Sequence, residues 1–225
     1  MVAVVALACG NNDFPGLTQR SDVEVHRTNA TPDKSEIDPL LADLPGGRLL
    51  VHGTDADLAS VVLRLLRREL LDSVAVGYIP AEASSVVADL WDLPARDPGR
   101  ALELAVDGDP DRVPLIRDDV GGVLLGRGVL GPLRGVVYCD DELVLRGQAG
   151  RLEVTPDPGA GEGLAVRTVR RSLFGGRGSS ATGRAVQIGC LPTRVVRDGI
   201  THPRPVNKWI WYRHTVDLRL VRGVV

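Results

Sequence analysis

The sequence predicts two domains, an N-terminal α/β domain with a parallel sheet and a C-terminal all-β domain built as an antiparallel sandwich. Over residues 49–94, apolar strands alternate with one-sided helices, the order expected of a parallel sheet. From Arg112 onward, short alternating runs separated by glycine turns take over. The composition changes between these parts, at residues 95–98. We therefore expect domains at residues 1–96 and 97–225, with a last strand that could return to the first domain.

The clearest helix of the first domain follows the turn at residues 52–57. Its apolar residues recur at i, i+3 and i+4, the spacing of a helix with one buried face. Thr54 or Asp55 can cap its first turn. The apolar start of the chain has no basic leader, so a buried first strand is favoured over a signal segment. The expected strands are residues 2–8, 23–28, 49–51 and 74–79, and the expected helices are residues 32–44 and 58–70, a short run ending at Leu93, and residues 101–106 beyond the boundary.

The second domain is expected to consist of short strands at regular intervals. Alternating apolar residues bounded by glycine turns are typical of antiparallel sheets with one buried face. The expected strands are residues 113–116, 122–125, 135–138, 143–145, 152–154, 164–167, 184–188 and 195–196. A further aromatic run at residues 209–214 also alternates.

The overall composition excludes several classes of protein. The net charge is -2 and the sequence pI is about 6.1, whereas a surface that binds nucleic acid usually needs a basic excess. No apolar run approaches the ~20 residues of a transmembrane helix. The three cysteines, Cys9, Cys139 and Cys190, are odd in number and far apart. Reduced thiols in a cytoplasmic protein are the simplest explanation.

The turn after residue 51 resembles a known phosphate loop. Residues 51–62 are similar to the strand, G-G-D-G-T turn and helix of the diacylglycerol kinase and NAD kinase superfamily, with Gly53 at a glycine and Asp55 at the aspartate. Residues 79–94 resemble the second loop of the lipid kinases, I-P-L-G-T-G-N-D-F-A-R-S-L-G-L-P, and keep Ile79, Pro80, Ala88, Leu93 and Pro94. The resemblance implies a nucleotide-binding domain followed by a β-rich domain, in a divergent member of the family.

The departures from the family pattern fall on the phosphate-binding positions. Ala56 and Asp57 replace the third glycine and the threonine, although glycine is what lets backbone amides approach phosphate oxygens. Asp57 would also place a negative charge where a polyphosphate would bind. In the second loop the polar G-T-G-N-D becomes residues 82–86, where Ser84 and Ser85 are the remaining candidates for binding nucleotide. The scaffold is expected to be kept and the phosphate site largely lost.

Further site residues are suggested by their positions in the family pattern. Asn11, or Asn12 beside it, would contact nucleotide after the first strand, and Thr28 would do so at the end of the second. A polar turn and an ordinary strand end explain these residues equally well. The resemblance implies that Asp198 is the catalytic carboxylate of a lipid-phosphorylating centre, although the glutamate of the family's D-G-E is Ile200 here. Without the family, the Asp-Gly pair indicates only a turn.

Other candidates have a simpler structural alternative. Asp141, in the acidic run 140–142, could bind Mg²⁺, and Asp55 is a separate metal candidate, but for the acidic run a hairpin turn with solvated acids is favoured. The loop at residues 174–184 could wrap an anion, although a loop between strands is the default. The cluster at residues 202–215 could grip a nucleotide base or lipid head group. A buried final strand carrying Trp209 and Trp211 is slightly preferred.

These observations lead to one main functional hypothesis and two alternatives. The main hypothesis is a catalytically impaired lipid kinase-like protein that binds a nucleotide or lipid in an interdomain cleft. The first alternative is an active ATP-dependent lipid phosphotransferase that uses Mg²⁺, with Asp198 as base, Asp55 near the metal and Gly53 and Thr54 at the phosphates. The second is a structural or partner-binding module. By analogy with the family, the chain could form a homodimer.

Overall fold

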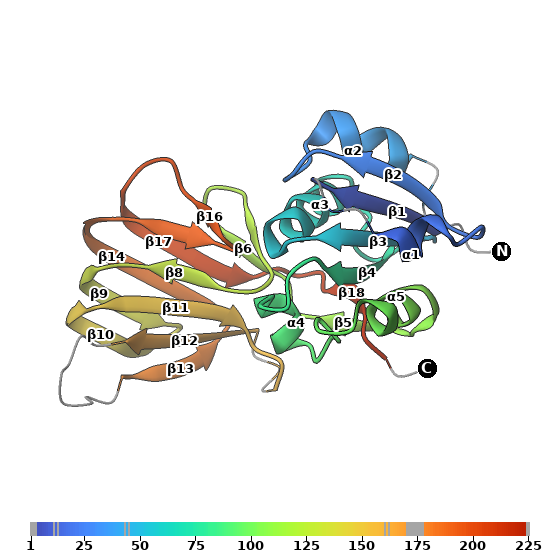
Figure 1. The fold of residues 1–225 in the computed structure, drawn as a ribbon. Helices are drawn as coiled ribbons and strands as arrows, with labels where there is room; N and C mark the ends of the chain where they lie inside the picture. The colour runs from blue at the N-terminus through green and yellow to red at the C-terminus, as the bar shows by residue number, and fades with distance from the viewer. Residues whose placement is uncertain are drawn as a thin grey trace. The chain divides into compact units, whose positions relative to one another are not determined.

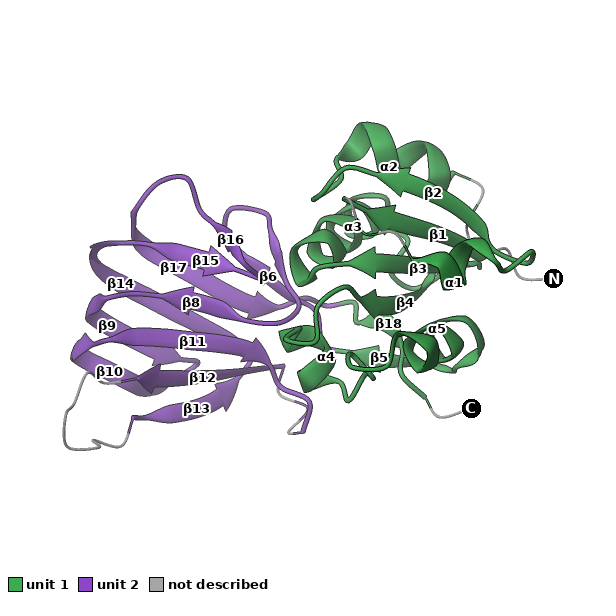
Figure 2. Ribbon diagram, in the orientation of Figure 1, with its two compact units in different colours: residues 1–113, 216–225 green, residues 114–215 purple. Residues whose placement is uncertain are grey.

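The computed structural model describes residues 4–10, 12, 14–42, 44, 46–159, 161, 163–169 and 178–223. The chain divides into two compact units (Figure 2). The first unit contains residues 1–113 and 216–225, and the second contains residues 114–215. The ribbon in Figure 1 labels the elements of both.

The first unit is built on a six-stranded sheet in the order β2-β1-β3-β4-β18-β5. Neighbouring strands from β2 to β18 run parallel, and only β5 is antiparallel, to β18. The prediction of an α/β domain with a parallel sheet is therefore confirmed. The strands are β1 (Val4–Cys9), β2 (Glu24–Thr28), β3 (Arg48–Gly53), β4 (Ala75–Pro80), β5 (Pro110–Val113) and β18 (Leu218–Val221), and the helices are α1 (Pro15–Thr18), α2 (Lys34–Leu41), α3 (Asp55–Arg67), α4 (Val86–Leu90) and α5 (Pro98–Asp107).

The sequence of α3 explains both its start and its packing. Thr54 is the N-cap, and its side chain accepts a hydrogen bond from the Asp57 N–H while the Asp57 carboxylate accepts from the Thr54 N–H. This reciprocal capping box satisfies two donors that the helix itself cannot. The apolar face predicted from the spacing is buried. On the outer side, Arg64 forms two hydrogen bonds with Asp38 and so ties α3 to α2.

Helix α5 packs directly on the sheet and belongs to the first unit, whereas we had expected it in the second domain. Ala101 and Ala105 lie in a core cluster with Leu50 and Ile79 of the sheet. Arg48 of β3 donates to the last carbonyl groups of the helix, those of residues 105, 106 and 108. A cation at this end suits the helix dipole, since the C-terminal carbonyl groups carry partial negative charge.

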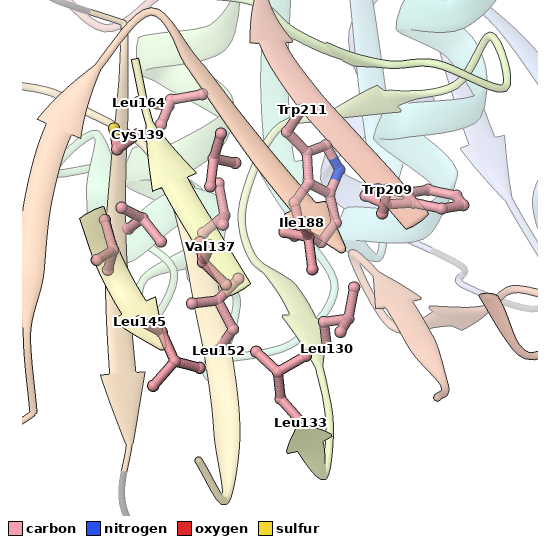
Figure 3. Packing of buried hydrophobic residues seen from close by; sticks show 14 of the residues in the cluster. Leu130, Leu133, Val137, Cys139, Leu145, Leu152, Leu164, Ile188, Trp209 and Trp211 are labelled. Atoms are coloured by element: carbon pink, nitrogen blue, oxygen red, sulfur yellow. The ribbon is translucent and has the colours of Figure 1, made fainter. Parts of the chain in front are cut away.

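The second unit contains two antiparallel six-stranded sheets, in the orders β10-β9-β14-β17-β6-β7 and β13-β12-β11-β8-β15-β16. The predicted antiparallel sandwich is confirmed. Alternate residues of the strands, such as Val137, Leu152, Leu164 and Ile188, form one buried cluster (Figure 3). The strands are β6 (Ile116–Asp118), β7 (Val123–Leu124), β8 (Gly128–Leu130), β9 (Leu133–Cys139), β10 (Glu142–Ala149), β11 (Arg151–Pro156), β12 (Leu164–Val169), β13 (Ser180–Gly183), β14 (Ala185–Thr193), β15 (Val195–Arg197), β16 (Ile200–Thr201) and β17 (Val206–Arg213).

Several expected boundaries differ from the structure. The run at residues 113–116 is not one strand, because the chain passes there from β5 in the first unit to β6 in the second. The aromatic run at residues 209–214 lies in β17 and stays in the second unit. It is β18, which we had not expected as a separate strand, that returns to the first sheet. The helical run that we expected to end at Leu93 ends at Leu90.

The close approach of β4 and α5 gives a test of this packing. A Cβ atom at Gly77 would lie 2.6 Å from the Ala105 carbonyl oxygen and 2.9 Å from the Ala105 Cβ. We therefore expect Gly77→Ala to reduce the free energy of unfolding of the first unit by about 1–3 kcal/mol, measured by urea denaturation followed by circular dichroism.

Gly99→Ala, in helix α5 that packs on β4, is the matched control. A Cβ at Gly99 would meet only the Asp97 Oδ1 at 3.5 Å, and alanine favours a helix more than glycine does. We expect no loss of stability from this variant. Equal losses from the two substitutions would contradict the packing described for Gly77.

Candidate functional site

The candidate site of the first unit lies where β3 and β4 end. Gly53 is the last residue of β3 and pairs with Pro80, the last residue of β4. Thr54 and Asp55 follow at the start of α3, and Ser85 caps the short helix α4. The carboxyl ends of parallel strands form the usual ligand-binding edge of an α/β sheet. The structure thus brings together four residues predicted from the sequence as nucleotide-binding.

Asp57 occupies the centre of the turn after β3. Its side chain is almost fully buried, with 2% of its surface exposed. One carboxylate oxygen accepts a hydrogen bond of 2.6 Å from the Thr31 N–H, and the other accepts from the Thr54 N–H at 2.7 Å and the Thr54 hydroxyl at 2.8 Å. It also covers Gly53, where an added Cβ would lie 2.7 Å from Asp57 Oδ2. The donors of this turn therefore already have an anion as their partner.

Asp55 makes a second cluster of the same kind. One of its oxygens accepts from the Ser85 hydroxyl at 2.5 Å and the Tyr78 hydroxyl at 3.0 Å, and the other accepts from the N–H groups of Val86 and Val87. Asp55 therefore satisfies the first amides of α4 rather than those of its own helix, which Thr54 caps. Burial, and next the charge of Asp55, raise the pKa of Tyr78 far above its usual range, so its hydroxyl remains a donor.

The donors around Asp55 bear on the predicted Mg²⁺ site. A magnesium ion needs carboxylate oxygens that are free to coordinate it in near-octahedral order. Both oxygens of Asp55 are engaged by four donors of the chain. In the described part of the chain, no three His, Cys, Asp or Glu side chains lie together as a metal site would require. The arrangement at Asp55 does not fit the metal.

Three further residues at this edge, Thr28, Cys9 and His52, are buried. Thr28, at the end of β2, has 9% of its surface exposed, and its hydroxyl donates to the Asn29 carbonyl group. Burial raises the pKa of the neighbouring Cys9 to about 11. Burial also lowers the pKa of His52, whose ring contacts Phe14 in a tilted arrangement with 5.3 Å between centroids. These residues line the edge without adding charge to it.

Asp198, the predicted catalytic base, lies in the second unit between β15 and β16. It is 7% exposed and has a positive φ of 44°. Its carboxylate accepts hydrogen bonds of 2.8–2.9 Å from three consecutive backbone N–H groups, those of Leu125, Gly126 and Arg127. Asp198 therefore holds together two segments that are far apart in the sequence. Ile200, which replaces the family's glutamate, is 40% exposed.

A buried ion pair that the sequence did not reveal adjoins this turn. Asp118 of β6 has no exposed surface, and it accepts hydrogen bonds from Arg197 of β15 and from the Gly122 N–H. The Arg197 guanidinium also lies over the Trp209 ring, 5.8 Å from its centroid. Asp118 and Arg197 thus link β6 to β15.

The other candidates of the second unit lie in a hairpin turn or in the buried core. Asp141 is exposed in the hairpin between β9 and β10, and the neighbouring Asp140 accepts from the N–H groups of Arg184 and Ala185. Trp209 and Trp211 are 1% and 0% exposed in the core of the second unit. They are core residues, which agrees with the slightly preferred interpretation, and as buried side chains they offer no exposed surface for a base or head group.

Three sequence candidates remain. Asn11 and residues 174–177 of the loop at residues 174–184 lie outside the described residues, and the rest of that loop enters β13. Asn12 donates to the Cys9 carbonyl group at 2.9 Å. Ser84 is exposed in the loop before α4. In the described part of the chain, no helix has the length and apolar character needed to cross a bilayer.

Sequence reasoning assigned Asp57 only a repulsive effect and overlooked its structural contacts. The signal was present, because Thr54 and Asp57 have the spacing of a capping box. The contact with Thr31 had no such signal, since 26 residues separate the partners.

The contacts of Asp57 predict a large effect on stability. Asp57→Ala removes the acceptor of two backbone donors and one hydroxyl, and a buried donor without a partner is costly. We expect the free energy of unfolding of the first unit to fall by about 2–4 kcal/mol, measured by urea denaturation.

Asp97→Ala is the matched control, because Asp97 also caps a helix of the first unit but is exposed and accepts from one backbone N–H. The expected loss is about 1 kcal/mol. A loss for Asp57→Ala no larger than that of the control would contradict the role given to Asp57.

Comparison with solved structures places this arrangement in a known fold. No family model and no curated protein matches the sequence. A diacylglycerol kinase structure from Bacillus anthracis is similar over 98% of this chain and 97% of its own, with a TM-score of 0.72 and 12% identity. An NAD kinase from Archaeoglobus fulgidus in complex with ATP is similar over 98% and 94%, with a TM-score of 0.62 and 13% identity. Yeast NADH kinase in complex with NADH is similar over 99% and 84%, with a TM-score of 0.60 and 10% identity.

These similarities cover both units of the chain at low sequence identity, as expected of a divergent sequence. They confirm the predicted resemblance at the level of the fold. The chain has the two-domain fold shared by diacylglycerol kinase-like proteins and NAD kinases.

Proposed function

We propose that this chain is a catalytically impaired protein of the diacylglycerol kinase and NAD kinase fold, which binds a nucleotide or a lipid without transferring phosphate. The observation that carries the proposal is the environment of Asp198. A general base needs an oxygen that faces the hydroxyl group it deprotonates. The Asp198 carboxylate instead accepts from three consecutive backbone N–H groups, so proton abstraction would have to compete with the bonds that hold its loop.

The turn after β3 supports the same conclusion. A phosphate-binding turn directs its backbone N–H groups at the ligand. Here the N–H groups of Thr31 and Thr54 already donate to Asp57, whose negative charge also opposes a polyphosphate. A triphosphate would have to displace this carboxylate from its buried position.

The choice of ligand rests on the fold neighbours. Two of the similar structures are complexes with ATP and with NADH. A nucleotide is therefore the first ligand class to test, and a lipid the second because other neighbours are diacylglycerol kinases.

The free thiols of Cys9, Cys139 and Cys190 support a reducing compartment such as the cytoplasm.

An active ATP-dependent lipid phosphotransferase is the second candidate. The observation in its favour is that both family carboxylates are retained, as Asp55 and Asp198. In this case Asp198 would have to leave its amide donors and accept the proton of a lipid hydroxyl. The two candidates differ in one measurable outcome, the appearance of phosphate in lipid.

Ligand binding is tested by thermal unfolding with ATP, ADP or NAD at millimolar concentration, with and without Mg²⁺. A ligand that binds only the folded chain raises the unfolding temperature. We expect at least one nucleotide, or a diacylglycerol in mixed micelles, to produce such a shift. If none does, and a partner protein co-purifies instead, the chain is a partner-binding module and the proposal is wrong.

Catalysis is tested by incubating the protein with radiolabelled ATP, Mg²⁺ and extracted lipids. We expect no label in the lipid fraction from the native chain. Label that appears with the native chain and is lost in Asp198→Asn would establish the active phosphotransferase. Asparagine tolerates a positive φ better than most residues, but its amide nitrogen cannot accept from the backbone N–H groups that both Asp198 oxygens serve. The folding of this variant is checked by circular dichroism.

A further inference from the structure

The second unit carries a hollow on the sheet formed by β11, β12 and β13. It has a volume of about 500 Å³, and all of its lining residues belong to these three strands. The strand register explains it. Ala165 of β12 pairs with Thr155 on one side and with Thr182 on the other. Because paired residues project from the same face of a sheet, the short Ala165 side chain leaves a gap between two hydroxyl-bearing neighbours.

The next row of the same face is charged. Glu153 of β11 pairs with Arg167 of β12, which pairs with Ser180 of β13. Glu153 is only 5% exposed and accepts hydrogen bonds from Arg167 and from Arg151, whereas the side chains of these arginines are 64% and 52% exposed. Burial alone would raise the pKa of Glu153, but the bonds from Arg167 and Arg151 outweigh it and lower that pKa. Glu153 is thus a fixed anion that positions two solvent-facing cations.

The charges and donors of this face favour an anionic ligand. The charged residues that line the hollow are Glu153 and Arg167, and Arg151, which pairs with Glu153 from outside the lining, adds a second cation beside it. Arg167 contacts Glu153 through Nε and Nη2, and its third nitrogen, Nη1, carries two further N–H donors. Thr155, Ser180 and Thr182 line the same hollow and can donate hydroxyl hydrogen bonds. Guanidinium and hydroxyl donors around a small space are the groups that bind a tetrahedral anion.

We propose that this hollow binds a phosphate group, either as the free ion or as a small phosphate monoester, with the anion over Ala165 and beside Arg167. A solvated cross-strand ion pair would account for Glu153 and Arg167 alone. It does not account for the small residue between two threonines, which opens the hollow next to that pair. The site lies wholly within the second unit and does not depend on whether the first unit binds a nucleotide.

The test is an NMR titration of the full chain with inorganic phosphate and, separately, with glycerol 3-phosphate, following backbone amide shifts of β11, β12 and β13.

Three variants distinguish the effect of the hollow's shape from the effect of its charge. Ala165→Leu fills the hollow without changing charge and should abolish the shifts. Arg167→Gln should weaken binding by about tenfold because a cation is lost. Glu153→Gln removes the competing anion and should tighten binding.

Arg146→Gln is the control, since Arg146 is an exposed arginine of β10 outside the hollow. It should bind phosphate as the native chain does. Tighter binding of the ester than of the free ion would assign the monoester, and the reverse would assign the ion. Shifts that persist in Ala165→Leu, or equal losses in Arg167→Gln and Arg146→Gln, would overturn the proposal. Before the titrations, thermal unfolding is measured to show that each variant has the same unfolding temperature as the native chain.

Discussion

Backbone N–H groups at the ends of β3 and β4 need acceptors, and two carboxylates of the chain provide them. Asp57 accepts from Thr31 and Thr54, and Asp55 accepts from the first amides of α4. In a turn that binds phosphate, such N–H donors stay available, and the phosphate oxygens accept their hydrogen bonds. Here carboxylates of the chain itself accept these hydrogen bonds. The geometry of this edge of the sheet follows from these contacts, because they fix the start of α3, the loop after β2 and the start of α4.

In the second unit, aspartate carboxylates likewise accept hydrogen bonds from backbone N–H groups. Asp198 satisfies three amides of residues 125–127, and Asp140 satisfies two at the start of β14. Both have positive φ values, which aspartate tolerates better than most residues. A carboxylate that receives several backbone donors stabilises the loop that supplies them. In a chain with the fold of these kinases, carboxylates that could take part in a reaction therefore stabilise loops instead. For this reason the proposed function is binding.

The connection between the units constrains how the first one folds. Its sheet is completed by β18, from residues 218–221, after the entire second unit has intervened. Contacts between residues so distant in sequence carry a high entropic cost of loop closure. Until β18 arrives, β4 and β5 lack the strand that lies between them. The two units are compact separately, but the first depends on the last residues of the chain.

The sequence by itself determined the fold class, most of the elements and the superfamily resemblance. These follow from local patterns, such as the apolar spacing of α3, the β3–α3–β4 order and the alternation of the second unit, and local patterns are visible in a linear chain. The tertiary structure decided what the polar residues do. The pairing of Asp57 with Thr31, of Asp198 with residues 125–127, and of Asp118 with Arg197 joins positions 26 to 79 residues apart. The identity of a carboxylate gives its charge, but its partners, and hence its role, depend on how the strands bring distant amides to it.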